Sequence, residues 1–588
     1  MKRSTYMAMT LPFVLSAYAM VPKIETGNHL DEQNITEIPR LITMSDILGE
    51  ETDSLESWSG LDPGKYADLN FYKKDGIAHL KGKIMNYSPS SGVQTFSIRT
   101  GNDFIRRERV NVGNINSDGS FELDVPVAYP QFDYFELGNI HQNLFLIPGD
   151  TLSIVSTMLT HIDPQMGKVA DYFGYDGNID DGVVINVLTD SLISKRYSLD
   201  NLYGGYYVAT SDSMESEIYK TNERLCGLLD SVVADLPGLL RDMPISSFAK
   251  DALSAIAISK ICGRMEDLEL DFQLVKGPGF KKNDDGTFSY QEGESLDLRK
   301  LVSPRLKHKG LIYDNPLLMV DGIVLPNRWD FNTLFHPAAM ASRGLRIIPG
   351  TCAYSQDYDF GETYRLADSR LDSIGVGNCF VAQMVRTSDF INGMNTDAIP
   401  SNKNLEMYGR LLGLLIRHND LVALNDILMP EYTKFVKNVL IAENSLDSET
   451  DSSRLIDASA DNDVFQKIIS PYKGNVLFID FWGIGCGPCR AGMISQKPLL
   501  AELADKPFKA LYVAKIDEME ACKKWLRNEE IKGEHIFVTG DDWTRFFGLF
   551  NITGTPHGVL VGKDGKVINP NYRIIYQGEP LLKEALDK

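Results

Sequence analysis

The sequence predicts a multidomain α+β protein with an N-terminal antiparallel β-sandwich, a mainly helical middle region and a C-terminal α/β domain. Three observations support this fold class. Short β-branched and aromatic segments, separated by turn residues, follow one another between residues 76 and 163. Residues 164–444 carry apolar residues at helical spacing. A nearly unbroken apolar run at 475–481 is typical of a strand buried in a parallel sheet.

Length and composition narrow the class of protein. The 588 residues suffice for about four domains. With 59 basic and 80 acidic side chains, the formal net charge is −21, which repels nucleic-acid phosphates and anionic lipids. We therefore expect no nucleic-acid partner. Seven cysteines are too few for a disulfide scaffold, so the core must come from apolar burial.

Residues 1–19 have the pattern of a signal peptide. Lys2 and Arg3 provide a short positive region, the apolar stretch 7–17 follows, and a small-x-small cleavage pattern ends at Ala19. The stretch is shorter than the roughly 20 residues of a transmembrane helix, and we expect no stable membrane span. An amphipathic N-terminal anchor is the alternative. Export predicts a periplasmic location, which is an oxidising compartment.

Composition and turn signals place the remaining segments. Residues 20–75 are polar and turn-rich, and we expect a linker region with one short helix. The β-sandwich is expected over 76–163 and the mainly helical region over 164–444. A Ser-, Asp- and Glu-rich linker at 445–463 then separates them from the C-terminal domain, 464–588.

The middle region contains four cysteines that an oxidising compartment could pair. Cys226 and Cys262 fall on consecutive expected helices at matching heights of a hairpin, so a disulfide between them is compatible with the sequence. A disulfide between Cys352 and Cys379 is equally open. Cys522, in the C-terminal domain, is expected to be a buried or partly buried free thiol. The pattern indicates no chemical role for the middle region.

The C-terminal domain carries a motif with a definite chemistry. The strand at 475–481 leads into Cys486-Gly-Pro-Cys489, a cysteine pair at the start of an expected helix. A helix N-terminus favours the thiolate form of a sulfur, and a thiolate is the species that attacks a disulfide. Half of a zinc site is the alternative. It needs a second ligand pair, and Cys522 with His535 lacks that spacing, so we expect neither a metal nor a cofactor.

The C-terminal domain resembles the thioredoxin superfamily, and most of all its secreted thiol–disulfide interchange branch of the TlpA/ResA type. The resemblance rests on the cysteine pair, on Asp480 six residues before Cys486, on Trp482, and on a Gly-Thr-Pro loop ending at Pro556. It implies a thioredoxin-like fold, a cis peptide bond at that proline, and two sets of site residues. These are the catalytic Cys486, Cys489, Asp480 and Pro556, and the substrate-docking Trp482 and Thr555.

Some positions depart from the family pattern or match it loosely. Gly485 replaces the aromatic residue that usually precedes the first cysteine, and the helix proline is Pro498, one turn later than usual. His557 follows the loop proline; it either tunes the thiolate as a neighbouring cation or is an exposed histidine. Lys515 occupies the strand that in thioredoxins brings a lysine near the buried acid, here Asp480.

These observations predict an exported thiol–disulfide oxidoreductase. The resemblance implies a reductase of protein disulfides that is recharged by a membrane thiol electron donor. The turns at Asp118–Phe121 and Pro148–Thr151 resemble a sandwich module found in secreted bacterial thioredoxin-like proteins, for which docking or spacing is the default role. The alternative is a periplasmic binding or adaptor protein that uses the thioredoxin fold as a redox-sensing or docking module. The Pro and Thr pattern of thiol peroxidases is absent.

Overall fold

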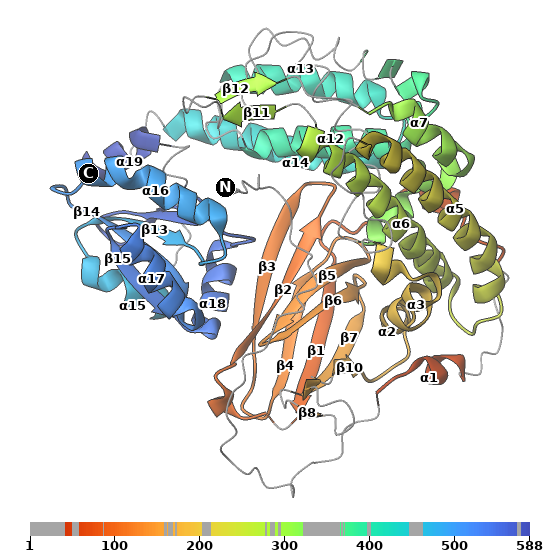
Figure 1. Ribbon diagram of the computed structural model, residues 1–588, viewed down its shortest axis with the longest axis horizontal. Helices are drawn as coiled ribbons and strands as arrows, with labels where there is room; N and C mark the ends of the chain where they lie inside the picture. The colour runs from red at the N-terminus through yellow and green to blue at the C-terminus, as the bar shows by residue number, and fades with distance from the viewer. Residues whose placement is uncertain are drawn as a thin grey trace, which may run out of the picture.

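The computed structural model describes most of the chain (Figure 1). The described residues are 41–49, 58–85, 87–157, 161–162, 169–170, 173–202, 213–276, 279–282, 288–291, 296–321, 365, 368–369, 371–396, 402–445, 463–572 and 578–587. The expected signal peptide at 1–19, Cys352 and almost all of the expected linker at 445–463 lie outside these residues. The architecture is a mixed α/β multidomain one, with several antiparallel sheets and many helices.

Two four-stranded sheets form the sandwich. Sheet A has the order β10-β7-β1-β4 and sheet B the order β3-β2-β5-β6. The strands are β1 (Ile77–Met85), β2 (Thr95–Asn102), β3 (Arg107–Asn114), β4 (Ser120–Pro126), β5 (Gln131–Leu137), β6 (Ile140–Leu146), β7 (Thr151–Thr157) and β10 (Phe173–Tyr175), with a small hairpin of β8 (His161–Ile162) and β9 (Val169–Ala170). All pairs in the two sheets are antiparallel except β1 with β7, which are parallel. Contrary to expectation, the sandwich is therefore not wholly antiparallel. It also extends beyond residue 163, because β10 belongs to sheet A.

The helical region arches over one end of the sandwich (Figure 1). Its long helices are α5 (Met214–Leu240), α6 (Ser247–Lys276), α12 (Phe380–Thr396), α13 (Asn402–His418) and α14 (Val422–Ser445). Shorter ones are α2 (Asp181–Leu188), α3 (Lys195–Tyr197), α7 (Leu298–Val302) and α8 (Lys309–Ile312), and a hairpin of β11 (Gly279–Lys282) and β12 (Phe288–Gln291) follows α6. Leu225, Leu229 and Val232 of α5 are buried, as their three-and-four spacing predicts.

The described part of the expected linker at 20–75 is packed, which corrects that expectation. It contains α1 (Met44–Leu48) and a short 3₁₀ turn at Pro63–Tyr66. Trp58 and Tyr66 are buried in the same hydrophobic core as α5 and α6. The large apolar residues of this segment follow no regular helix or strand period, and their partners lie far away in the sequence.

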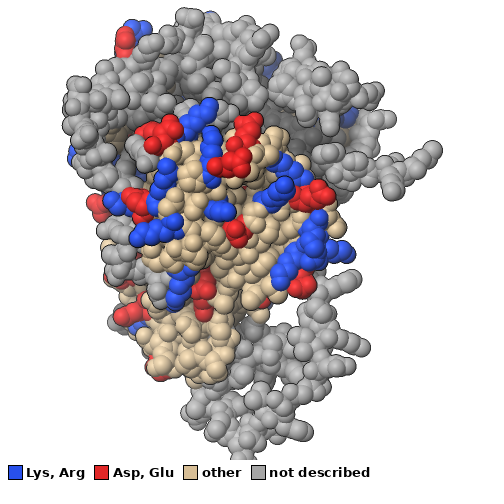
Figure 2. All heavy atoms as spheres, turned by 90° about the vertical axis from the view of Figure 1, so that its left-hand side faces the viewer, with Lys and Arg blue, Asp and Glu red and all other residues tan. Residues whose placement is uncertain are grey.

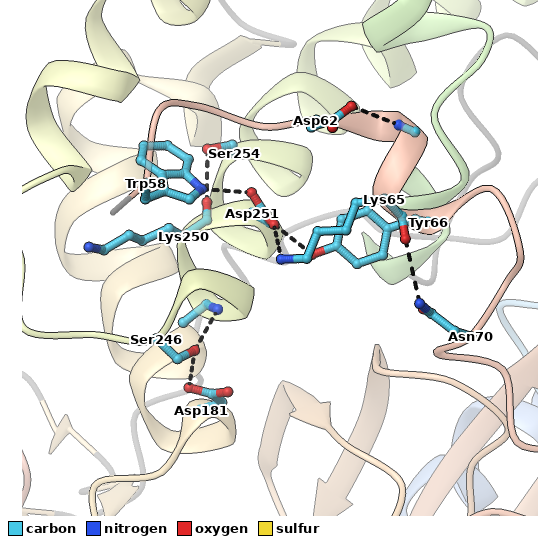
Figure 3. Close-up of polar contacts among 12 residues, drawn as sticks. Trp58, Asp62, Lys65, Tyr66, Asn70, Asp181, Ser246, Lys250, Asp251 and Ser254 are labelled. Carbon is cyan, nitrogen blue, oxygen red and sulfur yellow. Dashed lines mark hydrogen bonds and ion pairs between the residues drawn. The ribbon is translucent and has the colours of Figure 1, made fainter. Parts of the chain in front are cut away.

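A buried carboxylate holds this segment against α6 (Figure 3). Asp251 accepts hydrogen bonds from the Trp58 indole N–H at 2.7 Å and from the Tyr66 hydroxyl at 2.6 Å. The Lys65 ammonium lies 3.1 Å from the same carboxylate. Burial, followed by the hydrogen bond and charge of Asp251, raises the pKa of Tyr66. Three donors from one segment therefore converge on a side chain that is 2% exposed.

The C-terminal domain has a five-stranded sheet of order β15-β14-β13-β16-β17. Its strands are β13 (Val476–Phe481), β14 (Phe508–Lys515), β15 (Glu534–Val538), β16 (His557–Val561) and β17 (Val567–Asn569), and its helices are α15 (Asp463–Ile469), α16 (Gly487–Glu502), α17 (Met519–Asn528), α18 (Gly540–Phe550) and α19 (Gly578–Asp587). The pairs among β13, β14 and β15 are parallel, whereas β16 and β17 run antiparallel. A separate hydrophobic cluster covers each face of this sheet. No helix among the described residues is long and apolar enough to cross a membrane.

Replacing Asp251 with Ala should destabilise the packing of the N-terminal segment. The substitution leaves the Trp58, Tyr66 and Lys65 donors without their acceptor, and an unsatisfied buried group costs about 1–3 kcal/mol. We expect a loss of about 3 kcal/mol in the free energy of unfolding, measured by urea denaturation followed by fluorescence. The exposed Asp68 is the control, since Asp68→Asn should change it by less than about 0.5 kcal/mol. Equal effects of the two substitutions would contradict this role of Asp251.

Candidate functional site

The two cysteines meet at the start of α16. Cys486 caps the helix, and its sulfur accepts a hydrogen bond from the backbone N–H of Cys489 at 3.2 Å. The two are joined by a disulfide, with their Cα atoms 5.3 Å apart. Cys486 is half-buried, whereas Cys489 is 1% exposed. The outer sulfur can therefore meet a partner, while the inner one can meet only its neighbour.

The alternation of β13 places Asp480 on the same side of the sheet as Cys489. Phe478 and Trp482, two residues to either side of Asp480, belong to the hydrophobic cluster that contains Cys489. Asp480 is 4% exposed and lies opposite Tyr512 of β14. Burial, followed by the negative charge of Asp480, raises the pKa of Tyr512. The acid therefore lies in the core beneath α16, where the sequence places it.

Trp482 does not have the substrate-docking position expected of it. Its ring is 1% exposed and packs against Trp525 of α17, with the ring centroids 5.6 Å apart. A side chain without accessible surface cannot contact a docked protein, so Trp482 is part of the core. The sequence did not reveal this because Trp525 lies on a helix 43 residues further along the chain.

Lys515 lies on the opposite side of the sheet from Asp480. It is the last residue of β14 and alternates with Leu511 and Val513, which belong to the cluster on the α18 face. Its ammonium lies 5.9 Å from the centroid of the Trp543 ring on α18. The expected neighbourhood of lysine and buried acid is therefore not present.

The loop before β16 lies at the same end of the sheet's strands as the cysteines. The Thr555–Pro556 peptide bond is cis, as the family resemblance implied, and both residues are half-buried. His557, the next residue, pairs with Phe481 at the end of β13, from which the chain continues to Cys486. The pairing therefore places the loop and the cysteine pair at the same end of these two neighbouring strands.

His557 is buried in the structure. It is 7% exposed, and its Nε2 donates to the carbonyl oxygen of Pro570 at 2.7 Å. Its ring lies 6.3 Å from that of Phe481, on the α18 face of the sheet. Of the two alternatives, an exposed histidine is excluded, and this geometry gives no support to a role for His557 in tuning the thiolate. Pro498 lies inside α16, as expected.

Glu518 is a site residue that the sequence did not single out. Its carboxylate accepts a hydrogen bond from the backbone N–H of Ile484 at 2.9 Å and therefore holds the loop that leads into Cys486. A Cβ atom on Gly483 would lie 3.1 Å from the same carboxylate, which explains a small residue there. The only signal in the sequence is the position of Glu518 shortly after β14.

The described thiols outside the pair are buried. Cys226 is a free thiol, so the Cys226–Cys262 disulfide considered from the sequence is not formed. Cys379 is also a free, buried thiol, and burial raises its pKa to about 12. Cys522 is free and buried, as expected. Among the described residues, no group of three or more His, Cys, Asp or Glu side chains could hold a metal ion.

The fold and site define a class of protein. The site is a thioredoxin-like dithiol site on a five-stranded mixed sheet. It combines a cysteine pair at a helix N-terminus with a cis-proline loop at the same end of the strands. Such a pair can alternate between a disulfide and two thiols, and it exchanges two electrons with a partner disulfide.

Comparison with known proteins agrees with this class. Over 96 residues the chain is 27% identical to the thiol-disulfide oxidoreductase ResA of a Bacillus cereus strain, covering 16% of this chain and 54% of that protein. It is 25% identical over 100 residues to ResA of Bacillus thuringiensis subsp. konkukian, covering 17% and 56%. The match thus spans about half the length of these curated relatives. No family model matches the chain.

Two solved structures that resemble this chain each cover a fifth of it. The thioredoxin domain of a thiol-disulfide oxidoreductase from Bacteroides vulgatus has 24% identity and a TM-score of 0.19, over 20% of this chain and 84% of that one. A thiol:disulfide interchange protein from Bacteroides sp. has 23% identity and a TM-score of 0.19, over 20% and 78%. The curated relatives and the site geometry together support a thioredoxin-like thiol–disulfide oxidoreductase over this fifth of the chain.

The thiols of the reduced protein should differ sharply in reactivity. Burial, followed by the charge of Glu518, raises the pKa of Cys522 to about 11, so at pH 8 only about one molecule in a thousand carries its thiolate. Iodoacetamide should therefore label Cys486 of the folded protein at pH 8 and leave Cys522 unlabelled, as measured by peptide mass spectrometry. Because Cys522 is also fully buried, its labelling should stay low for as long as the protein is folded. Equal labelling of both at pH 8 would show that Cys522 is not protected.

Proposed function

We propose that this chain is an exported thiol–disulfide oxidoreductase that reduces protein disulfides through Cys486 and Cys489. The observation that carries the proposal is the asymmetry of the pair. Cys486 is accessible at a helix N-terminus, and Cys489 is buried directly beneath it. The resemblance to secreted thiol–disulfide interchange proteins and the pattern of a signal peptide at 1–19 support a periplasmic location.

The proposed reaction proceeds in two exchange steps. The Cys486 thiolate attacks one sulfur of the substrate disulfide, a mixed disulfide forms, and the other substrate sulfur leaves as a thiolate. Cys489 then loses its proton and attacks the Cys486 sulfur, which releases the second substrate thiolate. Two electrons pass to the substrate, and the protein is left with its own disulfide. Asp480, buried on the same side of the sheet, is the proposed acceptor of the Cys489 proton.

The proposed function also requires an electron source and a surface that meets the substrate. A membrane thiol electron donor is the proposed partner that restores the two thiols after each turnover. Figure 2 shows acidic and basic side chains interspersed over the face of the C-terminal domain that is turned to the viewer. With a net charge of −21, the chain is not proposed to bind nucleic acid.

A second candidate function, a binding or adaptor protein, is favoured by one observation. A cavity of about 630 Å³ lies between the sandwich, the N-terminal segment and α14. Tyr72, Arg107, Arg109 and Glu431 contribute to its lining, and Arg107 and Glu431 form an ion pair of 3.0 Å. A cavity of this size can take a small ligand, whose binding a thioredoxin-like module could then report.

Reduction of insulin by dithiothreitol separates the two candidates. The full chain should accelerate the reaction, measured as turbidity from the released B chain. The Cys486→Ala variant should not, because it lacks the attacking thiolate. Negligible turnover by the folded wild-type protein would favour the adaptor function.

Replacing Cys489 with Ala should turn the protein into a trap for its substrates. Attack by Cys486 still forms the intermolecular disulfide, but the thiol that releases it quickly is gone. The covalent complexes should survive non-reducing electrophoresis of extracts from cells whose thiols were blocked before lysis. The control is the Cys486→Ala, Cys489→Ala double substitution, which should trap nothing. If the folded and exported single variant also captures no protein, the oxidoreductase proposal loses its support.

A further inference from the structure

The C-terminal domain is attached to the sandwich through both ends of one helix. At the start of α18, the carboxylate of Asp541 accepts hydrogen bonds from the backbone N–H groups of Gln94, at 2.9 Å, and Thr95, at 3.1 Å. It also accepts from the Thr95 hydroxyl at 2.9 Å. Just past its end, Asn551 bonds to β3. The two points are ten residues apart, or about 15 Å along a helix, so α18 is attached at both of its ends.

Asn551 pairs with the edge of sheet B as a neighbouring strand would. Its amide oxygen accepts from the backbone N–H of Val110 at 2.8 Å, and its amide nitrogen donates to the carbonyl of Glu108 at 2.9 Å. β3 is an edge strand, so these backbone groups have no strand beyond them. Asn551 has a φ of 50°, a left-handed conformation that asparagine tolerates better than most residues. Asparagine at this position therefore combines a left-handed backbone with a side-chain amide that pairs with β3.

The body of α18 lies directly on the sandwich (Figure 1). A Cβ atom on Gly548 would lie 2.5 Å from a methyl carbon of Val112, so the helix and β3 are in contact there. Thr95 and Ser97 of β2, on the outer face of sheet B, are buried. The outer face of sheet B therefore packs against α18.

The same helix supports the redox site from its other face. The rings of Trp543, Phe546 and Phe550 lie 6.0, 5.4 and 5.9 Å from that of Phe481. Phe481 ends β13 and is five residues from Cys486. A shift of α18 would therefore reach the strand that carries the cysteine loop.

The cis-proline loop is anchored at Asn551 itself. Only four residues separate Asn551 from Pro556, and the first of them, Ile552, is fully buried. The backbone N–H and C=O of Thr555 make no hydrogen bond with the backbone of any described residue. They are therefore available to pair with an extended polypeptide, provided that the loop is held in place.

We propose that Asn551 is a positioning residue through which the β-sandwich holds the cis-proline loop in register for polypeptide substrates. The inference rests on the proposed oxidoreductase function and deepens it, because it assigns the sandwich a part in substrate recognition. A polypeptide that pairs with Thr555 depends on the position of the loop. A small disulfide that meets only the Cys486 sulfur does not.

The test compares two substrates on the full chain. Asn551→Gly keeps the left-handed backbone conformation and removes both hydrogen bonds to β3. We expect its KM for insulin to rise about fivefold, as the loss of hydrogen bonds of ordinary net strength produces. Its kcat/KM for 5,5′-dithiobis(2-nitrobenzoate), a small disulfide, should stay within about twofold of wild type. Asn528→Gly, at an exposed position ending α17, is the matched control and should change neither value.

A second variant disrupts the contact between α18 and β3 by steric clash. Gly548→Leu introduces a good helix former whose side chain cannot fit against Val112, so it should raise the KM for insulin in the same way. Combining it with Asn551→Gly should add little, since both break one contact. An unchanged KM for insulin in both variants, or an equal loss with both substrates, would overturn the inference. Failure of the wild-type protein to reduce insulin would instead refute the proposed function.

Discussion

Burial of β13 on both faces is the constraint on which the redox site depends. Its alternate residues enter two different hydrophobic clusters: Val476 and Phe478 lie on the α16 face, whereas Leu477, Ile479 and Phe481 lie on the α18 face. A slip by one residue would exchange the two sets and place Asp480 among the aromatic rings of α18. The register of this strand therefore places the buried acid beneath α16 and the cysteine pair at its end.

The second face of the strand connects the site with the rest of the molecule. Phe481 packs on the aromatic residues of α18, and α18 rests on the outer face of sheet B. The helical core, in turn, includes residues of the sandwich and the N-terminal segment held by Asp251. The sandwich is thus in contact with both neighbours, and a spacer role alone leaves these contacts unexplained.

The sequence predicted what local pattern determines. A buried strand, a cysteine pair at a helix start and a Gly-Thr-Pro loop are each readable within a dozen residues, and the structure contains all three. Of the eight strands in the two sandwich sheets, the apolar segments at 78–84, 95–98, 121–127 and 144–147 predicted four, which are β1, β2, β4 and β6. The edge strand β3 is among the four that were missed, because its residues 107–114 are mostly polar.

Predictions that required distant partners were less successful. The burial of Trp482 depends on Trp525, and the packing of Trp58 depends on a carboxylate 193 residues away. The contact of Asn551 with β3 joins residues 441 apart in the chain, and a single asparagine after a helix has many other uses. Lys515 was placed beside Asp480 by analogy alone, although strand alternation puts it on the other face.

The reduction potential of the Cys486–Cys489 pair tests the central claim most directly. It is measured on the full chain by equilibration in glutathione or dithiothreitol buffers, with the fraction of free thiols determined by alkylation and mass spectrometry. A reductase of protein disulfides requires a value near that of thioredoxin, about −270 mV, because electrons must flow from the pair to the substrate. A value near about −120 mV, as in strong oxidants of the periplasm, would contradict the proposed direction of electron flow.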